Sequence, residues 1–263
     1  MDYEGAVLDL DGTVYRGDAA LPGAADAIDR FRRAGVRPLF FSNNPTKSRT
    51  AYAERLSRLG IDATPGEILS AGTVTTEYLV ERHASDAVLL IGDDGLAAQF
   101  DAAGLELETE PTEADVLVVS WTDTFDYDDL VAGYRAIASG ATFYGTDPDR
   151  LIPAADGMAP GSGAIVNAVG GTAGREPEKT LGKPSAEAQR AALDALDSPA
   201  ERCFVVGDRL NTDIELGERA GMTTVLVRTG IVADDGIDES DVRPDHVVGS
   251  LADVPEELGI GGA

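Results

Sequence analysis

Two aspartates that leave a short apolar run are the residues of this sequence best suited to chemistry. Asp9 and Asp11 stand two positions apart directly after the run 6–8, and Gly12 follows them. Because ligands of open α/β sheets bind at the carboxyl ends of the strands, both carboxylates are placed to meet one. Gly12 lets the backbone turn sharply and approach a ligand closely. An ordinary acidic turn is the alternative, since Asp-Gly is a common turn dipeptide.

Two further segments offer groups that suit an anion. Ser42 and Asn43 follow the apolar run 38–41, and a hydroxyl, an amide and exposed backbone N–H groups together fit a phosphate, although a helix-capping turn uses the same residue types. Lys183 stands between Gly and Pro at a helix entry. Its compact ammonium would neutralise an anion or a carboxylate there, and a surface lysine is the alternative.

A second acidic pair follows another apolar run. Asp208 follows the run 203–206 after one glycine and can reach a metal. Asp213 stands at a helix start, where it can support that metal site or act as a helix N-terminal charge. The segment 92–95 also ends a strand with acids, but no Thr-Asp pair follows it. We interpret that segment as a turn before a helix.

Strands and helices that alternate along the chain must position these groups, and the alternation favours an α/β fold with a parallel sheet. Short apolar runs predict the strands, at residues 6–8, 38–41, 87–91, 116–120, 141–144, 203–206, 224–227 and 245–248. Apolar residues at helical spacing, several ending at a glycine, predict helices at residues 24–34, 49–59, 95–103, 128–139, 161–170, 186–196 and 212–220.

The middle of the chain carries its own strand–helix alternation. Residues 84–179 are numerous enough to form a domain inserted into the first one. We therefore predict a Rossmann-like catalytic core from residues 1–83 and 180–263, interrupted by an α/β domain at 84–179.

With these four segments in this order, the chain resembles the haloacid dehalogenase superfamily of aspartate-nucleophile phosphatases. The resemblance covers nearly the whole chain and rests on Asp-x-Asp-Gly-Thr at 9–13, Ser42, Lys183 and Gly-Asp-x-x-x-Thr-Asp at 207–213. The same motifs with their flanking residues, at positions 9–17, 42–46, 182–185 and 207–214, are similar to the NagD-type and 4-nitrophenylphosphatase-like branch. In that branch a large α/β cap lies between the second and third motifs. The predicted insertion stands at that point of the chain.

The resemblance implies a Mg²⁺ site, and oxygen ligands suit this hard cation. The Asp9 carboxylate, the Asp11 main-chain carbonyl and Asp208 would be its protein ligands. Asp213, with Asn211 near it, would order the metal-bound waters. A cation is needed because carboxylates facing a phosphate dianion would repel it.

The resemblance also implies a mechanism for hydrolysing a phosphate monoester. Asp9 would attack phosphorus and form an aspartyl-phosphate, and Asp11 would act as general acid and then as general base. Ser42, Lys183 and the backbone N–H groups of Gly12 and Asn43 would hold the phosphate oxygens.

The substrate would be a small phosphorylated metabolite, namely a sugar phosphate, phosphoglycolate, glycerol phosphate or a nucleotide monophosphate. In the predicted cap, Thr146, Asp147 and Asp149 are candidates for substrate contact, although a turn after a strand explains them equally. Two other functions stay open at this point: a phosphotransferase or mutase of the same superfamily, and a phospho-aspartate signalling module. The fate of the phosphoryl group, passed to water, passed to a sugar or retained, distinguishes them.

Composition limits the partners. The formal net charge is −26, from 21 basic and 47 acidic residues, so nucleic acid and anionic membranes are unfavourable partners. Only three cations are lysines, a composition that suits a halophilic, salt-rich cytoplasm, although an ordinary acidic protein from a GC-rich genome, in which Arg codons replace Lys, is the alternative. Cys203 is the only cysteine and is expected to be a buried apolar residue. We find no signal peptide and no membrane-spanning run, so we expect a soluble cytoplasmic protein, with a homo-oligomer through the cap as one possibility.

Overall fold

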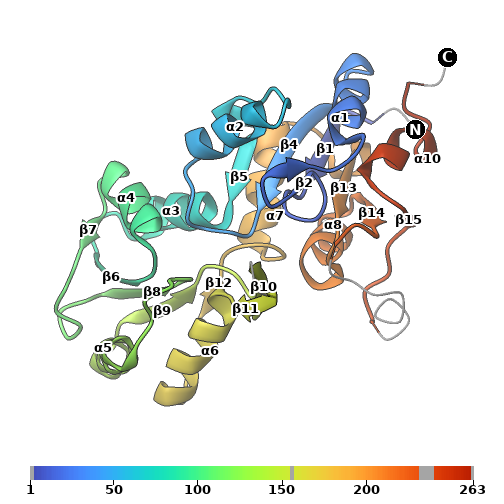
Figure 1. Cartoon of the computed structure of the whole chain (residues 1–263). Coiled ribbons are helices and arrows are strands. Elements are labelled where there is room, and N and C mark those ends of the chain that lie inside the picture. Colours follow the sequence, from blue (N-terminus) through green and yellow to red (C-terminus); the bar gives the residue numbers. More distant parts are fainter. Residues whose placement is uncertain (1–2, 155–156, 231–239, 262–263) are drawn as a thin grey trace. The chain divides into compact units, whose positions relative to one another are not determined.

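A computed structural model describes residues 3–154, 157–230 and 240–261 (Figure 1). The chain divides into two compact units: Met1–Ser42, Arg49–Leu69 and Ala188–Ala263 form the first, and Asn43–Ser48 and Ser70–Glu187 form the second. The second unit extends beyond the predicted insertion at 84–179 and includes the segment around Lys183. The assignment of residues 84–179 as a cap stays a prediction.

The first unit is built on a sheet with the strand order β15-β14-β13-β1-β4-β5. β1 lies at its centre and pairs in parallel with β4 and β13, while β14 pairs in parallel with β13 and β15. The predicted α/β fold with a parallel sheet is therefore confirmed. The strands are β1 (Gly5–Leu8), β4 (Arg37–Ser42), β5 (Ile68–Ser70), β13 (Cys203–Gly207), β14 (Thr223–Val227) and β15 (His246–Val248).

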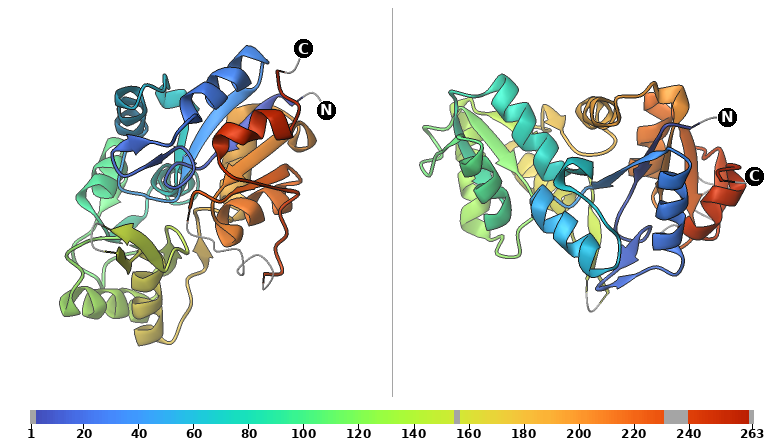
Figure 2. Two further views of the ribbon diagram at one scale, coloured as in Figure 1. Left: turned by 45° about the vertical axis from the view of Figure 1, so that its right-hand side comes forward. Right: turned by 90° about the horizontal axis from the view of Figure 1, so that it is seen from above.

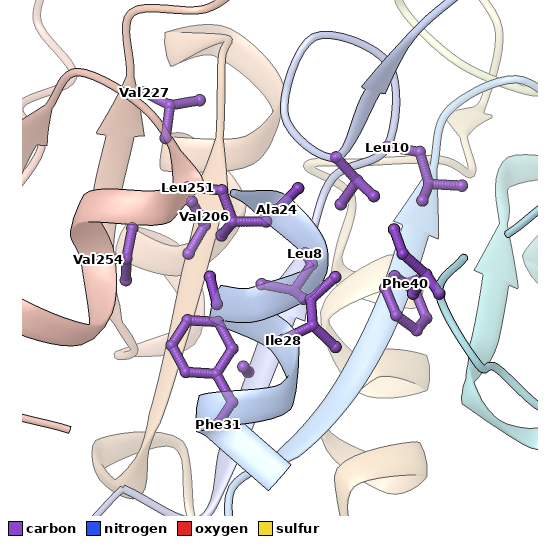
Figure 3. Close-up of a cluster of buried hydrophobic side chains, with 14 of the residues drawn as sticks. Leu8, Leu10, Ala24, Ile28, Phe31, Phe40, Val206, Val227, Leu251 and Val254 are labelled. Atoms are coloured by element: carbon purple, nitrogen blue, oxygen red, sulfur yellow. The ribbon is translucent and has the colours of Figure 1, made fainter. Parts of the chain in front are cut away.

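Helices cover both faces of this sheet because its central strands are apolar on both sides. On one face, α1 (Ala24–Arg33) buries Ile28 and Phe31 against the strands, together with residues near α10 (Val254–Glu257) (Figure 3). On the other face lie α7 (Ala186–Leu196) and α8 (Glu215–Ala220), and Figure 2 shows the two helix layers. Gly217 of α8 has no room for a side chain, since a Cβ there would lie 2.2 Å from Val205.

The second unit has its own parallel sheet in the order β12-β9-β8-β6-β7. Its faces bury separate apolar clusters, one beneath α3 and α4 and the other beneath α5 and α6. A β10–β11 hairpin precedes α6. The strands are β6 (Ala87–Ile91), β7 (Glu106–Leu107), β8 (Val116–Val119), β9 (Thr142–Gly145), β10 (Leu151–Ala154), β11 (Gly157–Pro160) and β12 (Lys179–Thr180). The helices are α3 (Ala71–Arg82), α4 (Asp94–Ala102), α5 (Tyr127–Ser139) and α6 (Ser162–Ala173).

The structure adds elements that the sequence patterns did not predict, and α3 is the longest. Ser70 caps α3, because its Oγ accepts from the Thr73 N–H at 3.1 Å while Thr73 Oγ1 accepts from the Ser70 N–H at 2.8 Å. The helix predicted at 212–220 begins instead as a π-turn at Leu210–Ile214 and becomes α-helical only at α8. Among the helices built from described residues, none has the length and apolar character required to cross a membrane.

Candidate active site

Asp9 and Asp11 leave the carboxyl end of β1 in a tight turn. The Asp9 N–H donates to the Val206 carbonyl at 2.9 Å, which continues the pairing with β13 by one residue, and Asp9 is buried whereas Asp11 is exposed. Gly12 has φ +95°, and a Cβ at this position would lie 2.6 Å from Asp208 Oδ2. The turn therefore requires glycine both for its backbone conformation and for its approach to Asp208.

Three carboxylates from the ends of β1 and β13 meet within the first unit. Asp9, Asp208 and Asp213 each contribute one oxygen to a group whose members all lie within 4.8 Å of one another. Asp208 and Asp213 are both 1 % exposed. Like charges buried this close repel one another unless a cation or protons compensate them, and oxygen ligands suit Mg²⁺. The donor set thus fits a divalent cation; the predicted contribution of Asp11 is its main-chain carbonyl, outside this side-chain group.

Asp213 reaches the group because Gly207 leaves room for it. A Cβ at Gly207 would lie 2.2 Å from the Asp213 Cβ, so the chain of the π-turn packs directly on the end of β13. Asp213 Oδ2 accepts from the Arg209 N–H at 3.1 Å, which fixes the carboxylate. Asn211, predicted beside it, lies in the same π-turn with an exposed side chain.

Ser42 ends β4 and is buried beneath α2 (Arg49–Arg58). The hydroxyl of Tyr52, on α2, donates to Ser42 Oγ at 3.3 Å. Burial raises the pKa of Tyr52 well above its ordinary value. Ser42 can then direct its own proton toward another acceptor, as a phosphate-binding hydroxyl must.

Arg55, one turn beyond Tyr52, is a residue that the sequence analysis missed. Its guanidinium lies 4.5 Å from the ring centroid of Tyr15, and its Nη2 donates to the Gly17 carbonyl at 2.8 Å. Both contacts hold the hairpin of β2 (Tyr15–Arg16) and β3 (Ala19–Ala20), which follows Asp11, against α2. Burial first, and then the nearby Asp11 carboxylate, raise the pKa of Tyr15. Nothing in the sequence distinguishes Arg55 from other arginines on a helix.

In the second unit, Lys183 and Asn43 lie together although 140 positions separate them. The Lys183 N–H donates to Asn43 Oδ1 at 2.8 Å, and Asn43 Nδ2 donates to the Lys183 carbonyl at 3.2 Å. Both residues are buried, with Lys183 only 1 % exposed. The scarcity of lysine drew attention to Lys183, and the structure excludes the alternative of a surface lysine; the hydrogen bonds of the Asn43 side chain to Lys183 were not anticipated.

The three candidates for substrate contact, Thr146, Asp147 and Asp149, are buried just after β9. Asp147 Oδ1 accepts from the Asp149 N–H at 3.1 Å, and the Thr146 hydroxyl lies 3.1 Å from Asp147 Oδ2. Burial, and then the neighbouring Asp149 carboxylate, raise the pKa of Asp147 to about 7. This segment is thus a packed, hydrogen-bonded turn that holds two acids out of water.

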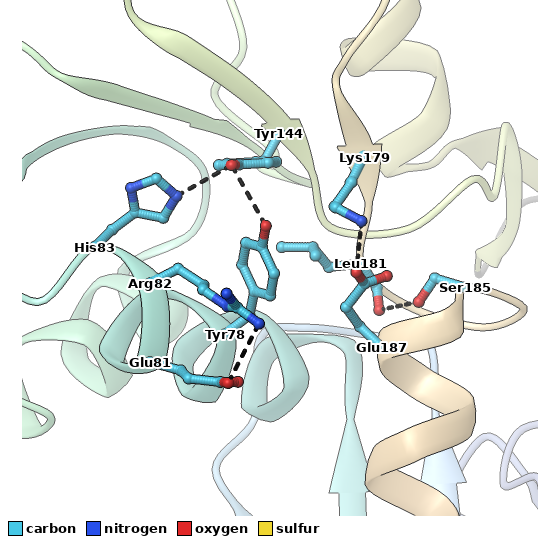
Figure 4. Close-up of polar contacts among 9 residues, drawn as sticks. All are labelled: Tyr78, Glu81, Arg82, His83, Tyr144, Lys179, Leu181, Ser185 and Glu187. Atoms are coloured by element: carbon cyan, nitrogen blue, oxygen red, sulfur yellow. Dashed lines mark hydrogen bonds and ion pairs between the residues drawn. The ribbon is translucent and has the colours of Figure 1, made fainter.

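A separate polar network lies on the α3 side of the second sheet (Figure 4). His83 Nε2 is 3.0 Å from the Tyr144 hydroxyl, and His83 Nδ1 is 2.7 Å from Asp86 Oδ2. The Tyr78 and Tyr144 hydroxyls lie 3.5 Å apart. The sequence patterns indicated no role for His83, and in the structure this residue joins the end of α3 to β9.

Two predictions about less conspicuous residues are confirmed. Asp93 Oδ1 accepts from the Gly95 N–H at 2.7 Å and caps α4, so the acidic segment 92–95 is a turn before a helix. Cys203 is fully buried in β13, and burial raises the pKa of its thiol to about 11. A thiol in this state is a packing residue and a poor nucleophile at neutral pH.

Comparison with known proteins defines the class to which this fold and these acids belong. Residues 6–106 match the model of the haloacid dehalogenase-like hydrolases, and residues 180–254 match the HAD-hydrolase-like model. The chain is 36 % identical over 250 residues to the sugar-phosphatase AraL of Bacillus subtilis, a match that covers 95 % of this chain and 91 % of AraL. This chain therefore belongs to the haloacid dehalogenase-like hydrolases.

Solved structures narrow the class further. The p-nitrophenyl phosphatase from Archaeoglobus fulgidus superimposes with a TM-score of 0.92 at 34 % identity, over 98 % of this chain and all of that one. NagD from Escherichia coli K-12 superimposes with a TM-score of 0.85 at 28 % identity, over 96 % of this chain and 98 % of NagD. The chain is a NagD-type phosphatase of this family, as the sequence motifs indicated.

Proposed function

We propose that this phosphatase hydrolyses phosphate monoesters of small sugars in a Mg²⁺-dependent reaction that passes through a phosphorylated Asp9. The observation that carries the proposal is the group of buried carboxylates from Asp9, Asp208 and Asp213. The substrate class draws on the relatives, among them sugar-phosphatase AraL and an acid sugar phosphatase of Staphylococcus epidermidis.

The Asp9 carboxylate, the Asp11 main-chain carbonyl and Asp208 would hold the Mg²⁺, and Asp213, which lies in the same carboxylate group, would order the metal-bound waters. When bound, the cation offsets the negative charge of these acids and of the phosphate, which the net charge of −26 would otherwise repel. Ser42, Lys183 and the N–H groups of Gly12 and Asn43 are assigned to the phosphate oxygens, where charge accumulates in the transition state.

Asp9 is assigned as the nucleophile and Asp11 as the proton carrier. An Asp9 oxygen forms a bond to phosphorus while the bond to the leaving oxygen breaks, and Asp11 gives that oxygen its proton. Asp11 then takes a proton from the water that attacks the phosphorylated Asp9, which releases phosphate and restores both carboxyls. Asp11 is exposed, so its carboxyl can exchange protons with the solvent. Asp9 is buried, so its carboxylate is shielded from the solvent.

The residues of the predicted insertion, 84–179, are proposed to serve as the cap that selects the substrate. Selection by a separate α/β unit agrees with the sheet that this segment forms around β6, β8 and β9. A phosphotransferase or a stable phospho-aspartate switch would use the same acids, so the test has to follow the phosphoryl group itself.

The decisive experiment measures inorganic phosphate released from a panel of sugar phosphates and 4-nitrophenyl phosphate, with Mg²⁺ and with EDTA. We expect Mg²⁺-dependent release from wild type, none from Asp9→Asn, and near wild-type release from Asp123→Asn, which alters an exposed acid. In Asp11→Asn, acid quenching and mass spectrometry should find phosphate on the peptide that contains Asp9. Substantial Mg²⁺-dependent turnover by Asp9→Asn would refute the proposed nucleophile.

A further inference from the structure

We propose that the side-chain amide of Asn43 positions Lys183 for the phosphate, and that residues 146–149 support this amide instead of contacting the substrate. This inference rests on the proposed function, in which Lys183 binds the phosphate oxygens. It assigns Asn43 a positioning role through its side chain, distinct from any contact that its backbone N–H makes.

The amide of Asn43 engages both peptide groups of Lys183. Its Oδ1 accepts from the Lys183 N–H at 2.8 Å and its Nδ2 donates to the Lys183 carbonyl at 3.2 Å. One rigid, planar group therefore fixes the main chain on either side of the Lys183 Cα. Because both residues are buried, water does not substitute for these bonds, and their loss leaves unpaired backbone groups.

The second N–H of the same amide points to the segment after β9. Asn43 Nδ2 lies 3.5 Å from Asp149 Oδ2, and the Asp149 N–H donates to Asp147 Oδ1 at 3.1 Å. Asp149 therefore accepts from Asn43 on one side and is anchored to Asp147 on the other. Since the Asp149 carboxylate can only accept hydrogen bonds, the side chain at position 43 has to be a donor.

The loop that carries Lys183 is tied to this segment a second time. The Gly182 N–H donates to the Thr146 carbonyl at 2.6 Å. A Cβ at Gly182 would lie 2.7 Å from that carbonyl oxygen and 2.9 Å from Asn43 Oδ1, so only glycine fits. Thr146, Asp147 and Asp149 are all buried and belong to the same hydrogen-bond network. We therefore assign their polar groups to holding the loop that carries Lys183.

An acid at position 43 would break this arrangement in a defined way. Asn43→Asp keeps the shape of the side chain and an acceptor for the Lys183 N–H, but it removes the donor and sets a carboxylate against Asp149. The double variant Asn43→Asp with Asp149→Asn exchanges the amide and the carboxylate between positions 43 and 149. It therefore restores a donor–acceptor pair between these two side chains. Asn44→Asp is the matched control, because it adds the same charge at the next position on an exposed side chain.

We expect Asn43→Asp to lower kcat/KM by about 100-fold, mostly through kcat, since a small displacement of a group that stabilises the transition state has that effect. Asn44→Asp should stay close to wild type, and the double variant should recover part of the loss, because it restores the pair between positions 43 and 149 but not the donor to the Lys183 carbonyl. Equal activities of Asn43→Asp and Asn44→Asp, or a double variant no better than Asn43→Asp, would overturn the inference.

A second readout does not depend on activity. The chain has three lysines, so protein labelled with ¹³C at lysine Cε gives a simple NMR spectrum, in which Lys183→Arg identifies the Lys183 signal. That signal should shift in Asn43→Asp and return toward its wild-type position in the double variant. If Asn43→Asp does not fold, Asp149→Ala, which removes the carboxylate that accepts from Asn43 Nδ2, should still lower kcat/KM about 10-fold; unchanged kinetics there would overturn the inference.

A wild-type protein that releases no phosphate from any substrate would refute the proposed function instead. The NMR comparison would then still decide whether Asn43 and Asp149 set the environment of Lys183. The two ideas can therefore fail separately.

Discussion

Replacing Asp147 by Asn should make the second unit more stable at neutral and alkaline pH. Asp147 is 2 % exposed, and its carboxyl accepts the Asp149 N–H in a site that also holds the Asp149 carboxylate. Asn has the shape of the protonated acid and keeps an acceptor for that N–H. The variant therefore removes the ionisation of this buried group and preserves its packing.

The size of the effect follows from the pKa of Asp147. Burial and the Asp149 carboxylate raise it from an ordinary 3.8 to about 7. A raised pKa of an acid means that the unfolded chain loses its proton first, so stability falls as pH rises from about 4 to about 7. The full difference corresponds to about 4 kcal/mol, which is an upper bound because neighbouring groups relax.

The assay is urea unfolding at pH 5, 6, 7 and 8 (about 1 M salt throughout, to screen the large net charge). Trp121 is the only tryptophan in the chain and belongs to the second unit, so its fluorescence reports on the unit that contains Asp147. Of the four pH values, the stability of Asp147→Asn relative to wild type should be lowest at pH 5, where much of the wild-type loss is still to come. The variant should then gain stability relative to wild type by a few kcal/mol by pH 8.

Asp123→Asn, an exposed position of the same unit, is the control for removing one negative charge. Its stability relative to wild type should change little with pH, since an exposed charge interacts weakly with its surroundings. A difference between Asp147→Asn and wild type that is the same at pH 5 and pH 8, or the same pH dependence in Asp123→Asn, would contradict a raised pKa of Asp147.

Three further predictions concern the first unit and the charge of the chain. Gly207→Ala should cost about 1–3 kcal/mol and reduce phosphatase activity, because its Cβ would overlap Asp213; thermal melting and kcat/KM test this. Mg²⁺ at about 100 times its Kd should stabilise wild type by about 2.7 kcal/mol in thermal melts, and Asp208→Asn should lose this gain; equal gains would exclude Asp208 as a ligand. The melting temperature should rise as KCl increases from about 0.1 to about 1 M, since salt screens the net charge of −26, whereas a constant value would contradict halophilic adaptation.

The local patterns of this sequence were sufficient to predict most of the strands and helices near the acids. β1, β4 and β13 are short runs of apolar residues buried on both faces, and each is followed by a polar group at its carboxyl end. The patterns failed at α3, whose threonine-rich sequence lacks an apolar stripe and depends on its Ser70 cap and on packing against α4 and β6. They also failed at the π-turn before α8, where the approach of Asp213 to Gly207 sets the backbone.

The sequence by itself identified the family of this protein and singled out the residues proposed to do its chemistry, namely acids at strand ends and a rare lysine beside Gly and Pro. These features depend on neighbouring residues, which a pattern records directly. Only the tertiary structure decided which side chains meet. Asn43 with Lys183, Asp149 with Asn43, and Tyr52 with Ser42 are contacts fixed by the packing of strands and helices. The burial that shifts the pKa of Asp147 likewise exists only once the chain has folded around it.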